Sequence, residues 1–170
     1  MATPHLSGSA AVVIGQHPAW AAWEVRSAIV NTAQEHVLRD TTTGACCVTD
    51  PNIVGSGLAD VNAATHATVA LNPVSVTFGA VPSGSGQSRS VTITVADLTG
   101  SGGTYRISIT NPSTAGVTFS VSKSSVTLAP NGTATVTITM SAQKRATAGD
   151  QWATLRIGSE HAVLYTFVKP

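Results

Sequence analysis

Two short stretches decide the fold of the larger part of this chain: Val91-Thr92-Ile93-Thr94-Val95 and Thr135-Val136-Thr137-Ile138-Thr139-Met140. In both, apolar side chains occupy every second position and threonine occupies the positions between them. Because successive side chains of a strand point to opposite faces of a sheet, this alternation predicts strands that bury one face only. Ile93 and Ile138 should therefore face a core, and the threonines beside them should face outward.

Similar short runs surround these two stretches, and turn-rich sequence separates them, such as Pro82-Ser83-Gly84-Ser85-Gly86 and Pro130-Asn131-Gly132. Together they give seven or eight short strands within about a hundred residues, which predicts an all-β antiparallel sandwich. The Cys…Trp…Cys core of true immunoglobulin domains is absent, so the exact topology stays open. The further predicted strands are Val74–Phe78, Thr104–Ile109, Val117–Val121, Ser125–Leu128, Trp152–Ile157 and Ala162–Val168.

The N-terminal part has a different periodicity, because apolar residues before about residue 67 recur at helical spacing. The change predicts two units, residues 1–66 and residues 70–170. Residues 10–14 are apolar on every side, and a helix of that kind must be surrounded by protein. Without such surroundings, these helices would expose an apolar surface that favours association.

Composition favours an exported protein and argues against two classes of partner. Charged residues make up 10% of the chain, against about 25% in average soluble domains. The formal net charge is +1 and no cluster of Lys and Arg occurs, so we expect no nucleic-acid partner. No apolar run approaches the roughly 20 residues of a membrane-spanning helix, so we expect no membrane span.

The two cysteines, Cys46 and Cys47, are adjacent. A bond between them would close a strained eight-membered ring, and the chain holds no third cysteine. Two readings stay open: a disulfide to a partner outside this sequence, or two small buried thiols in a loop.

The sequence predicts no metal site and no cofactor. The five histidines (His5, His17, His36, His66 and His161) show no close ligand spacing of the kind found in zinc sites. Asn131-Gly132-Thr133 fits the pattern of an N-glycosylation acceptor. Asn-Gly between alternating runs is also a strong hairpin-turn signal, and we favour the turn.

The opening octapeptide, Met1-Ala2-Thr3-Pro4-His5-Leu6-Ser7-Gly8, resembles the segment after the nucleophile of subtilisin-like serine endopeptidases, the subtilase family. In that family Gly-Thr-Ser precedes Met-Ala-Thr-Pro-His. Residues 7–14 look like the small, apolar helix expected next, and residues 17–33 look like the following helix, ending in Asn-Thr-Ala. Residues 55–64 look like the closing Gly-x-Gly and Val-Asn-Ala-Ala segment. These landmarks keep the family's order and cover residues 1 to about 66.

One position departs from the family pattern. The second helix is usually capped by Ser or Thr followed by Pro, and this chain has Ala21-Ala22 there. Loss of such a cap typically costs about 0.5–2 kcal/mol. We therefore expect a frayed or displaced helix start.

The resemblance implies where the chemistry of the family would lie. It places the nucleophilic serine immediately before Met1, and the triad His, the triad Asp and the oxyanion-binding Asn farther upstream. The resemblance therefore implies that no catalytic residue lies within this chain. The neighbours of the site would be Met1, Ala2, Thr3, Pro4 and His5. A triad built from His5, Ser7 and one of Asp40, Asp50 or Asp60 was considered, since triads depend on geometry. We interpret His5 and Ser7 as structural, with Ser7 on the buried helix.

The resemblance also implies a fold class and a function. Residues 1–66 are expected to be the incomplete, helical C-terminal remnant of an α/β subtilisin-like domain, so the whole chain is of the α + β class. Residues 70–170 resemble the fibronectin-III or immunoglobulin-like modules that often follow such domains. The expected function is that of the C-terminal part of a secreted, extracellular endopeptidase acting on polypeptides, inactive by itself. The alternative is a β-sandwich module that binds a protein, a glycan or a cell surface.

The two predicted units should differ in resistance to proteolysis, because only residues 70–170 can close a two-sheet core. Limited proteolysis of the 170-residue chain should leave a resistant fragment that begins between about residues 64 and 74. Mass spectrometry of the fragment would locate its start. Equal resistance of residues 1–66 would contradict this division.

Overall fold

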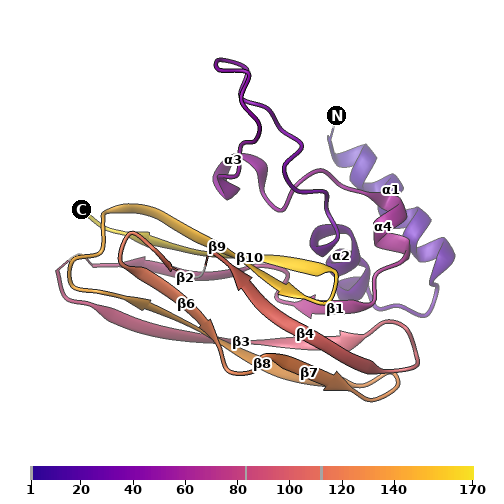
Figure 1. The fold of residues 1–170 in the computed structure, drawn as a ribbon. Helices are drawn as coiled ribbons and strands as arrows, with labels where there is room; N and C mark the ends of the chain where they lie inside the picture. Colours follow the sequence, from indigo (N-terminus) through magenta and orange to yellow (C-terminus); the bar gives the residue numbers. More distant parts are fainter. Residues whose placement is uncertain (1, 83, 112) are drawn as a thin grey trace.

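The fold is described from a computed structural model, which covers residues 2–82, 84–111 and 113–170. A small helical part comes first and a β-rich domain follows (Figure 1). The helices are α1 (Ala2–Gln16), α2 (Ala22–Asn31), α3 (Pro51–Val54) and α4 (Val61–Thr65). The strands are β1 (Val69–Asn72), β2 (Val76–Val81), β3 (Gln87–Asp97), β4 (Gly103–Thr110), β5 (Ser113–Thr114), β6 (Val117–Val121), β7 (Ser125–Leu128), β8 (Thr133–Ala142), β9 (Gly149–Ile157) and β10 (Glu160–Val168).

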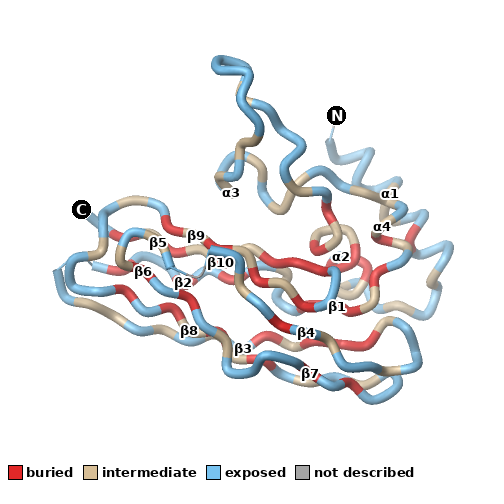
Figure 2. The backbone as a smooth tube through the Cα atoms, viewed as in Figure 1, coloured by how far each residue is buried: buried red, intermediate tan, exposed pale blue. Residues whose placement is uncertain are grey.

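The strands form two curled sheets that share one core (Figure 1). One sheet has the order β1-β3-β8-β6-β5 and the other has the order β2-β10-β9-β4-β7. Buried stretches of the backbone follow the strands of both sheets (Figure 2). The largest of the fully buried core side chains include Phe119, Leu71, Met140, Leu155 and Leu164.

The alternating stretches lie next to each other in the first sheet, as β3 and β8. Their antiparallel register places Ile93 opposite Val136 and Val91 opposite Ile138. Ile93 and Ile138 are fully buried, which confirms their predicted facing. The threonine hydroxyls of Thr92 and Thr137 lie 3.1 Å apart on the other face.

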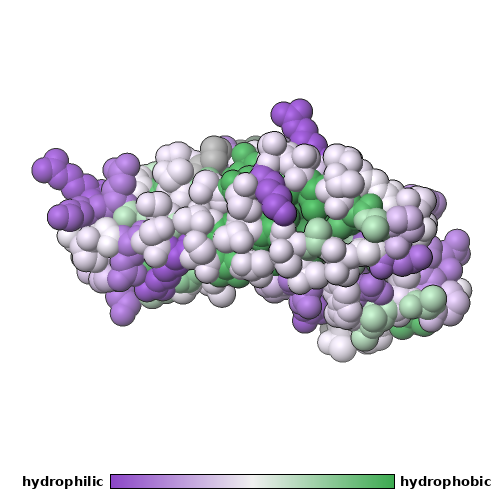
Figure 3. Space-filling model, turned by 90° about the horizontal axis from the view of Figure 1, so that it is seen from below, coloured by the Kyte–Doolittle hydropathy of each residue, from purple (hydrophilic) through white to green (hydrophobic). Residues whose placement is uncertain are grey.

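The face of the molecule that lies below in Figure 1 is largely neutral in hydropathy. Viewed from below, this face is mostly near neutral in hydropathy, with hydrophobic side chains visible along its middle and strongly hydrophilic ones mainly towards the two ends (Figure 3). This agrees with a surface made of Ser and Thr on the outward positions of β3 and β8.

The expectation of an entirely antiparallel domain is wrong at one edge, where β2 pairs with β10 in parallel. The chain leaves the first sheet at Asn72 and joins the second at Val76, so the predicted strand Val74–Phe78 starts too early. Pro73 supplies the physical reason, because proline has no N–H to donate to a sheet ladder. The strand before it, β1, was not predicted.

The chain also changes sheet between β6 and β7, and it returns to the first sheet at β8. The predicted turn at Pro130-Asn131-Gly132 is present, and Asn131 has a φ of 53°. It joins strands of different sheets, so it closes no two-stranded hairpin. Of the other predicted turn, Ser83 lies outside the described residues.

The helical part has a separate small core, made by Val13, Val25, Ala28, Ala64 and Ala67. Val13 is the buried residue of α1, and most of this helix is exposed (Figure 2). Its large apolar side chains stay in water: Leu6 is 48% exposed, Val12 55% and Ile14 50%. The sequence predicted such an apolar surface for helices that lack their surroundings.

Helix α2 begins at Ala22, so its predicted displacement does not occur. Alanine at position 21 has no side-chain acceptor for the free helical N–H groups. The Glu24 carboxylate instead accepts a hydrogen bond of 2.7 Å from the Ala21 N–H. An acidic side chain in the first turn also suits the positive end of the helix dipole.

A buried relay of hydrogen bonds fastens α2 to the β-rich domain. The Leu71 N–H donates to Ser27 Oγ, and the Ser27 hydroxyl donates to Asn31 Oδ1, each over 2.7 Å. Asn31 Nδ2 donates to the carbonyls of Val74 and His161, also over 2.7 Å. Ser27 and Asn31 are both fully buried. One amide thus binds the turn between β1 and β2 and the start of β10.

Because inward and outward side chains alternate along β3 and β8, truncating them to alanine should lower the free energy of unfolding by unequal amounts. Ile93→Ala or Ile138→Ala should lower the free energy of unfolding by about 2–5 kcal/mol, because each leaves a cavity in the shared core. Thr137→Ala should lower it by less than about 1 kcal/mol, as for most surface changes. Urea unfolding followed by circular dichroism would measure both. A costlier threonine change would mean that the register is wrong by one residue.

The hydrogen-bond relay at α2 predicts that two asparagine variants differ in their free energy of unfolding. Asn31→Ala should lower the free energy of unfolding by about 2–4 kcal/mol, because it leaves two carbonyls and the Ser27 hydroxyl without their partner. Asn62→Ala on the exposed surface of α4 is the matched control and should cost less than about 0.5 kcal/mol. Similar costs for the two asparagines in the same urea experiment would refute a stabilising role of the relay.

Candidate functional site

The predicted site neighbours lie at the start of α1. Ala2, Thr3, Pro4 and His5 form its exposed N-terminal end, and Met1 lies outside the described residues. Ser7 is also exposed, so the expectation that it lies on a buried helix is wrong for this structure. The physical reason is that α1 reaches the small helical core mainly through Val13, near its other end.

The three aspartates considered for a triad all serve local backbone structure. Asp50 caps α3 by accepting from Asn52 N–H, and Asp60 caps α4 by accepting from Ala63 N–H, both over 2.9 Å. Asp40 accepts from the N–H groups of two residues that follow it in a turn, and these bonds hold the pKa of its carboxyl below the usual value. These contacts explain why the acidic side chains stand where they do.

The structure reveals a cavity that the sequence did not predict. It measures about 290 Å³ and lies between the outer face of β9 and β10 and the segment of residues 34–58 that carries α3. Figure 1 shows this segment standing above the two strands. The size is near the lower end of small-molecule sites, which occur preferentially where two structural units meet.

The floor of the cavity is the outward face of the β9–β10 pair. Trp152, Thr154 and Arg156 point outward from β9, between buried residues. Val163 lies opposite Thr154 and His161 lies opposite Arg156 on β10. An outward face with tryptophan and valine differs from the threonine face of β3, and it indicates that something covers it.

The wall of the cavity comes from loop residues that remain partly in water. Val37 is 41% exposed, Leu38 45% and Leu58 60%. Two polar contacts fasten this wall to the sheet: Arg156 forms an ion pair with Glu35, and His161 Nε2 lies 3.0 Å from the Ser56 carbonyl oxygen.

Gly57 allows two segments of the cavity wall to approach each other closely. Gly57 has a φ of 127°, and a Cβ there would collide with the backbone carbonyl of Gln34. The neighbouring Leu58 and Gln34 exchange backbone hydrogen bonds of 2.7 and 3.0 Å. The second glycine of the Gly-x-Gly landmark is therefore needed for this close approach.

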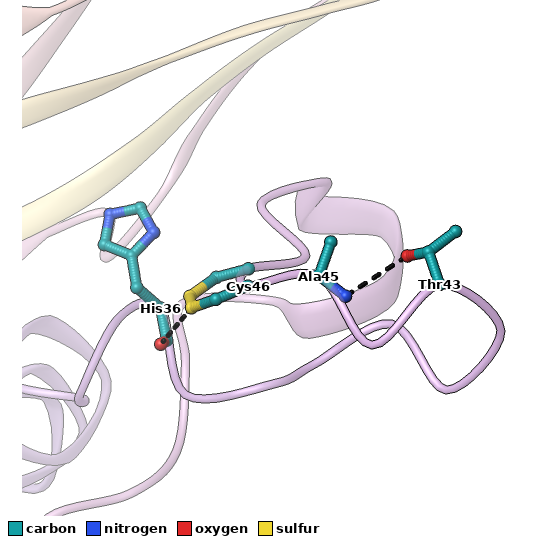
Figure 4. The surroundings of a disulfide bond; sticks show 5 residues. His36, Thr43, Ala45 and Cys46 are labelled. Carbon is teal, nitrogen blue, oxygen red and sulfur yellow. Dashed lines mark hydrogen bonds between the residues drawn. A yellow bond between two sulfur atoms is a disulfide. The ribbon is translucent and has the colours of Figure 1, made fainter.

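The cysteines are bonded to each other in the structure, so neither predicted reading holds. Their Cα atoms lie 3.0 Å apart, and Cys46 is exposed rather than buried. Figure 4 shows the disulfide beside the His36 carbonyl oxygen, which lies 3.8 Å from the Cys46 sulfur.

This disulfide lies on a hairpin next to the cavity wall. The hairpin is closed by backbone bonds from Val48 N–H to the Leu38 carbonyl and from Asp40 N–H to the Ala45 carbonyl. Leu38 and Val48 also line the cavity. The cysteines thus belong to the framework that shapes the wall.

No group of three or more His, Cys, Asp or Glu side chains is placed to hold a metal ion in the described part of the chain. None of the helices within the described ranges is long and apolar enough to cross a membrane.

Only the floor of the cavity leaves a signal in the sequence. Residues 162–165, Ala-Val-Leu-Tyr, form a continuous apolar run, which is typical of a strand covered on both faces. No signal in the sequence says that residues 34–58 provide the cover, because contacts between distant segments leave no local pattern.

The N-terminal part of the chain is similar to a known protein family. The model of the subtilase family matches residues 1–57, and no curated protein matches the chain.

Solved structures match the chain only remotely. Domains 4 and 5 of the S-layer protein SbsC are 23% identical over 61% of this chain and 52% of that one, with a TM-score of 0.41. A PapD-like domain of human CEP192 is 15% identical over 59% of this chain and 84% of that one, with a TM-score of 0.43. The secreted serine protease VesC from Vibrio cholerae is 14% identical over 54% and 21%, with a TM-score of 0.38. These likenesses are too remote to assign a function. Residues 1–57 therefore match the subtilase family model, and a β-rich domain follows them.

Proposed function

We propose that this chain is the C-terminal part of a secreted, subtilisin-like serine endopeptidase that cleaves polypeptides in its full-length form. The single observation that carries the proposal is the subtilase match over residues 1–57. The exposed apolar side chains of α1 support it, because Leu6, Val12 and Ile14 fit a helix that packs against further protein.

The family chemistry assigns α1 a supporting role. In subtilases a serine attacks the peptide carbonyl and forms an acyl-enzyme, while an oxyanion hole stabilises the negative charge. The resemblance places that serine directly before Met1, at the start of α1. The first N–H groups of a helix have no partners within it and form its positive end. Helix α1 would thus support charge that develops at the serine.

The isolated chain should be inactive. By resemblance it lacks the nucleophile, the triad His, the triad Asp and the oxyanion-binding Asn. The aspartates that could have replaced them, Asp40, Asp50 and Asp60, accept hydrogen bonds from nearby backbone N–H groups. The residues next to the proposed serine, Ala2 to His5, then flank the site and perform no chemistry.

We propose a fibronectin-III or immunoglobulin-like identity for residues 70–170, as a unit distinct from residues 1–66. Two curled sheets with one shared core support this identity. The second candidate function is an interaction module that binds a protein, a glycan or a cell surface. The outward Trp152 and Val163 of β9 and β10 favour it, because they line a cavity on the outside of the domain.

The experiment that tests the peptidase proposal is labelling with a fluorophosphonate, which reacts with activated serines. The chain alone should show no labelling and no hydrolysis of peptide or ester substrates. A subtilase catalytic half ending in Gly-Thr-Ser, joined directly to Met1, should gain a labelled serine at the junction and proteolytic activity.

Two variants serve as controls for the labelling. Replacing the junction serine with alanine should abolish both the label and the activity of the joined protein. Ser7→Ala should leave the labelling of the joined protein unchanged, because Ser7 is interpreted as structural. Labelling of Ser7 in the isolated chain, lost on Ser7→Ala, would refute the proposal and indicate a different hydrolase.

A further inference from the structure

Apolar and charged side chains line the same cavity above β9 and β10. The apolar ones include Trp152 and Val163 from the sheet and Leu58 from the loop. Arg156, whose side chain is 38% exposed, lines the cavity as well and is paired with Glu35. A ligand that fills this space would contact both an apolar surface and a guanidinium group.

Arg156 retains hydrogen-bonding capacity. A guanidinium carries five N–H donors in a planar fork, and the described contacts of this side chain use the single bond from Nη2 to Glu35. Carboxylates suit the remaining donors, because Arg–carboxylate pairs form charge-assisted and often bidentate hydrogen bonds. The exposed fraction of the side chain leaves these donors accessible.

The apolar part favours a flat or branched group. The half-buried indole of Trp152 offers a face for stacking, and aromatic pairs gain energy beyond their buried area. Leu38 and Leu58 are 45% and 60% exposed, so an apolar occupant would remove surface that now faces water. The volume of about 290 Å³ suits a single large side chain.

We propose that this cavity binds an apolar carboxylate, namely the C-terminal residue of a peptide that ends in an aromatic side chain. The aromatic group lies on Trp152 and Val163, and the terminal carboxylate binds the free N–H groups of Arg156. Glu35 competes with the ligand for the same guanidinium. This binding rests on the second candidate function, an interaction module, and does not depend on serine chemistry.

The test is a titration of the 170-residue chain followed by ¹H–¹⁵N NMR, with the indole N–H signal of Trp152 assigned through Trp152→Phe. N-acetyl-phenylalanine should bind with a dissociation constant of about 1 mM, as expected for a ligand of this size. N-acetyl-phenylalaninamide, which has the same aromatic group and no charge, should bind about tenfold more weakly. Equal binding of acid and amide, or no binding of either, would overturn the proposal.

Variants at the ion pair should act in opposite directions. Arg156→Gln should reduce the preference for the acid to less than about twofold, and Glu35→Gln should strengthen acid binding by about threefold, because it removes the competing carboxylate. Arg106→Gln on β4, an exposed arginine outside the cavity, is the matched control and should leave binding unchanged. Weaker acid binding by Glu35→Gln in a folded protein, judged by its NMR spectrum, would contradict the assigned role of Arg156.

A third ligand distinguishes the source of the carboxylate. Decanoate has the same charged group on a straight chain that cannot stack on an indole. It should bind more weakly than N-acetyl-phenylalanine. Tighter binding of decanoate would overturn the assignment to a peptide C-terminus.

Discussion

The arrangement of helices and sheets depends on one buried amide. Asn31 accepts from Ser27 and donates to two backbone carbonyls, one in the turn between β1 and β2 and one at the start of β10. These carbonyls belong to two separate segments of the β-rich domain, so the amide links α2 to both of them. Hydrogen bonds in such a chain polarise one another in a low-dielectric interior. The position of α2 in turn sets where residues 34–58 leave the helix and cross the sheet.

Local patterns predicted the parts of the fold that depend on a single segment. Period-two alternation located β3 and β8 and the facing of Ile93 and Ile138, because side-chain direction in a strand is a local property. The crossing from β1 to β2 was missed, although Pro73 marks it. The choice of β10 as a parallel partner depends on where a distant strand lies, and no run of residues encodes that pairing by itself.

The candidate site, too, could be predicted only where it depends on a single segment of the chain. The opening octapeptide and the later landmarks predicted a subtilase segment, which the family model matches over residues 1–57. The exposure of Ser7 was predicted wrongly and the pairing of Cys46 and Cys47 was left open, because both depend on what surrounds the residue in space. The cavity could not be predicted, since its floor and its wall are about a hundred residues apart in the chain. Glycine at position 57 was read as a family landmark, and the structure adds its reason, the close approach of the Gln34 carbonyl.

The parallel pairing of β2 with β10 has a mechanical consequence. Because the two strands run in the same direction, tension between the start of β2 and the end of β10 would slide them lengthwise past each other. The evenly spaced bonds of a parallel pair then share the load, whereas an antiparallel hairpin pulled from its open end would separate one bond at a time. The pairing runs from Leu164–Val76 to Val168–Val81 with a register shift between Tyr165 and Phe167, so the bonds on both sides of that shift would resist such sliding together.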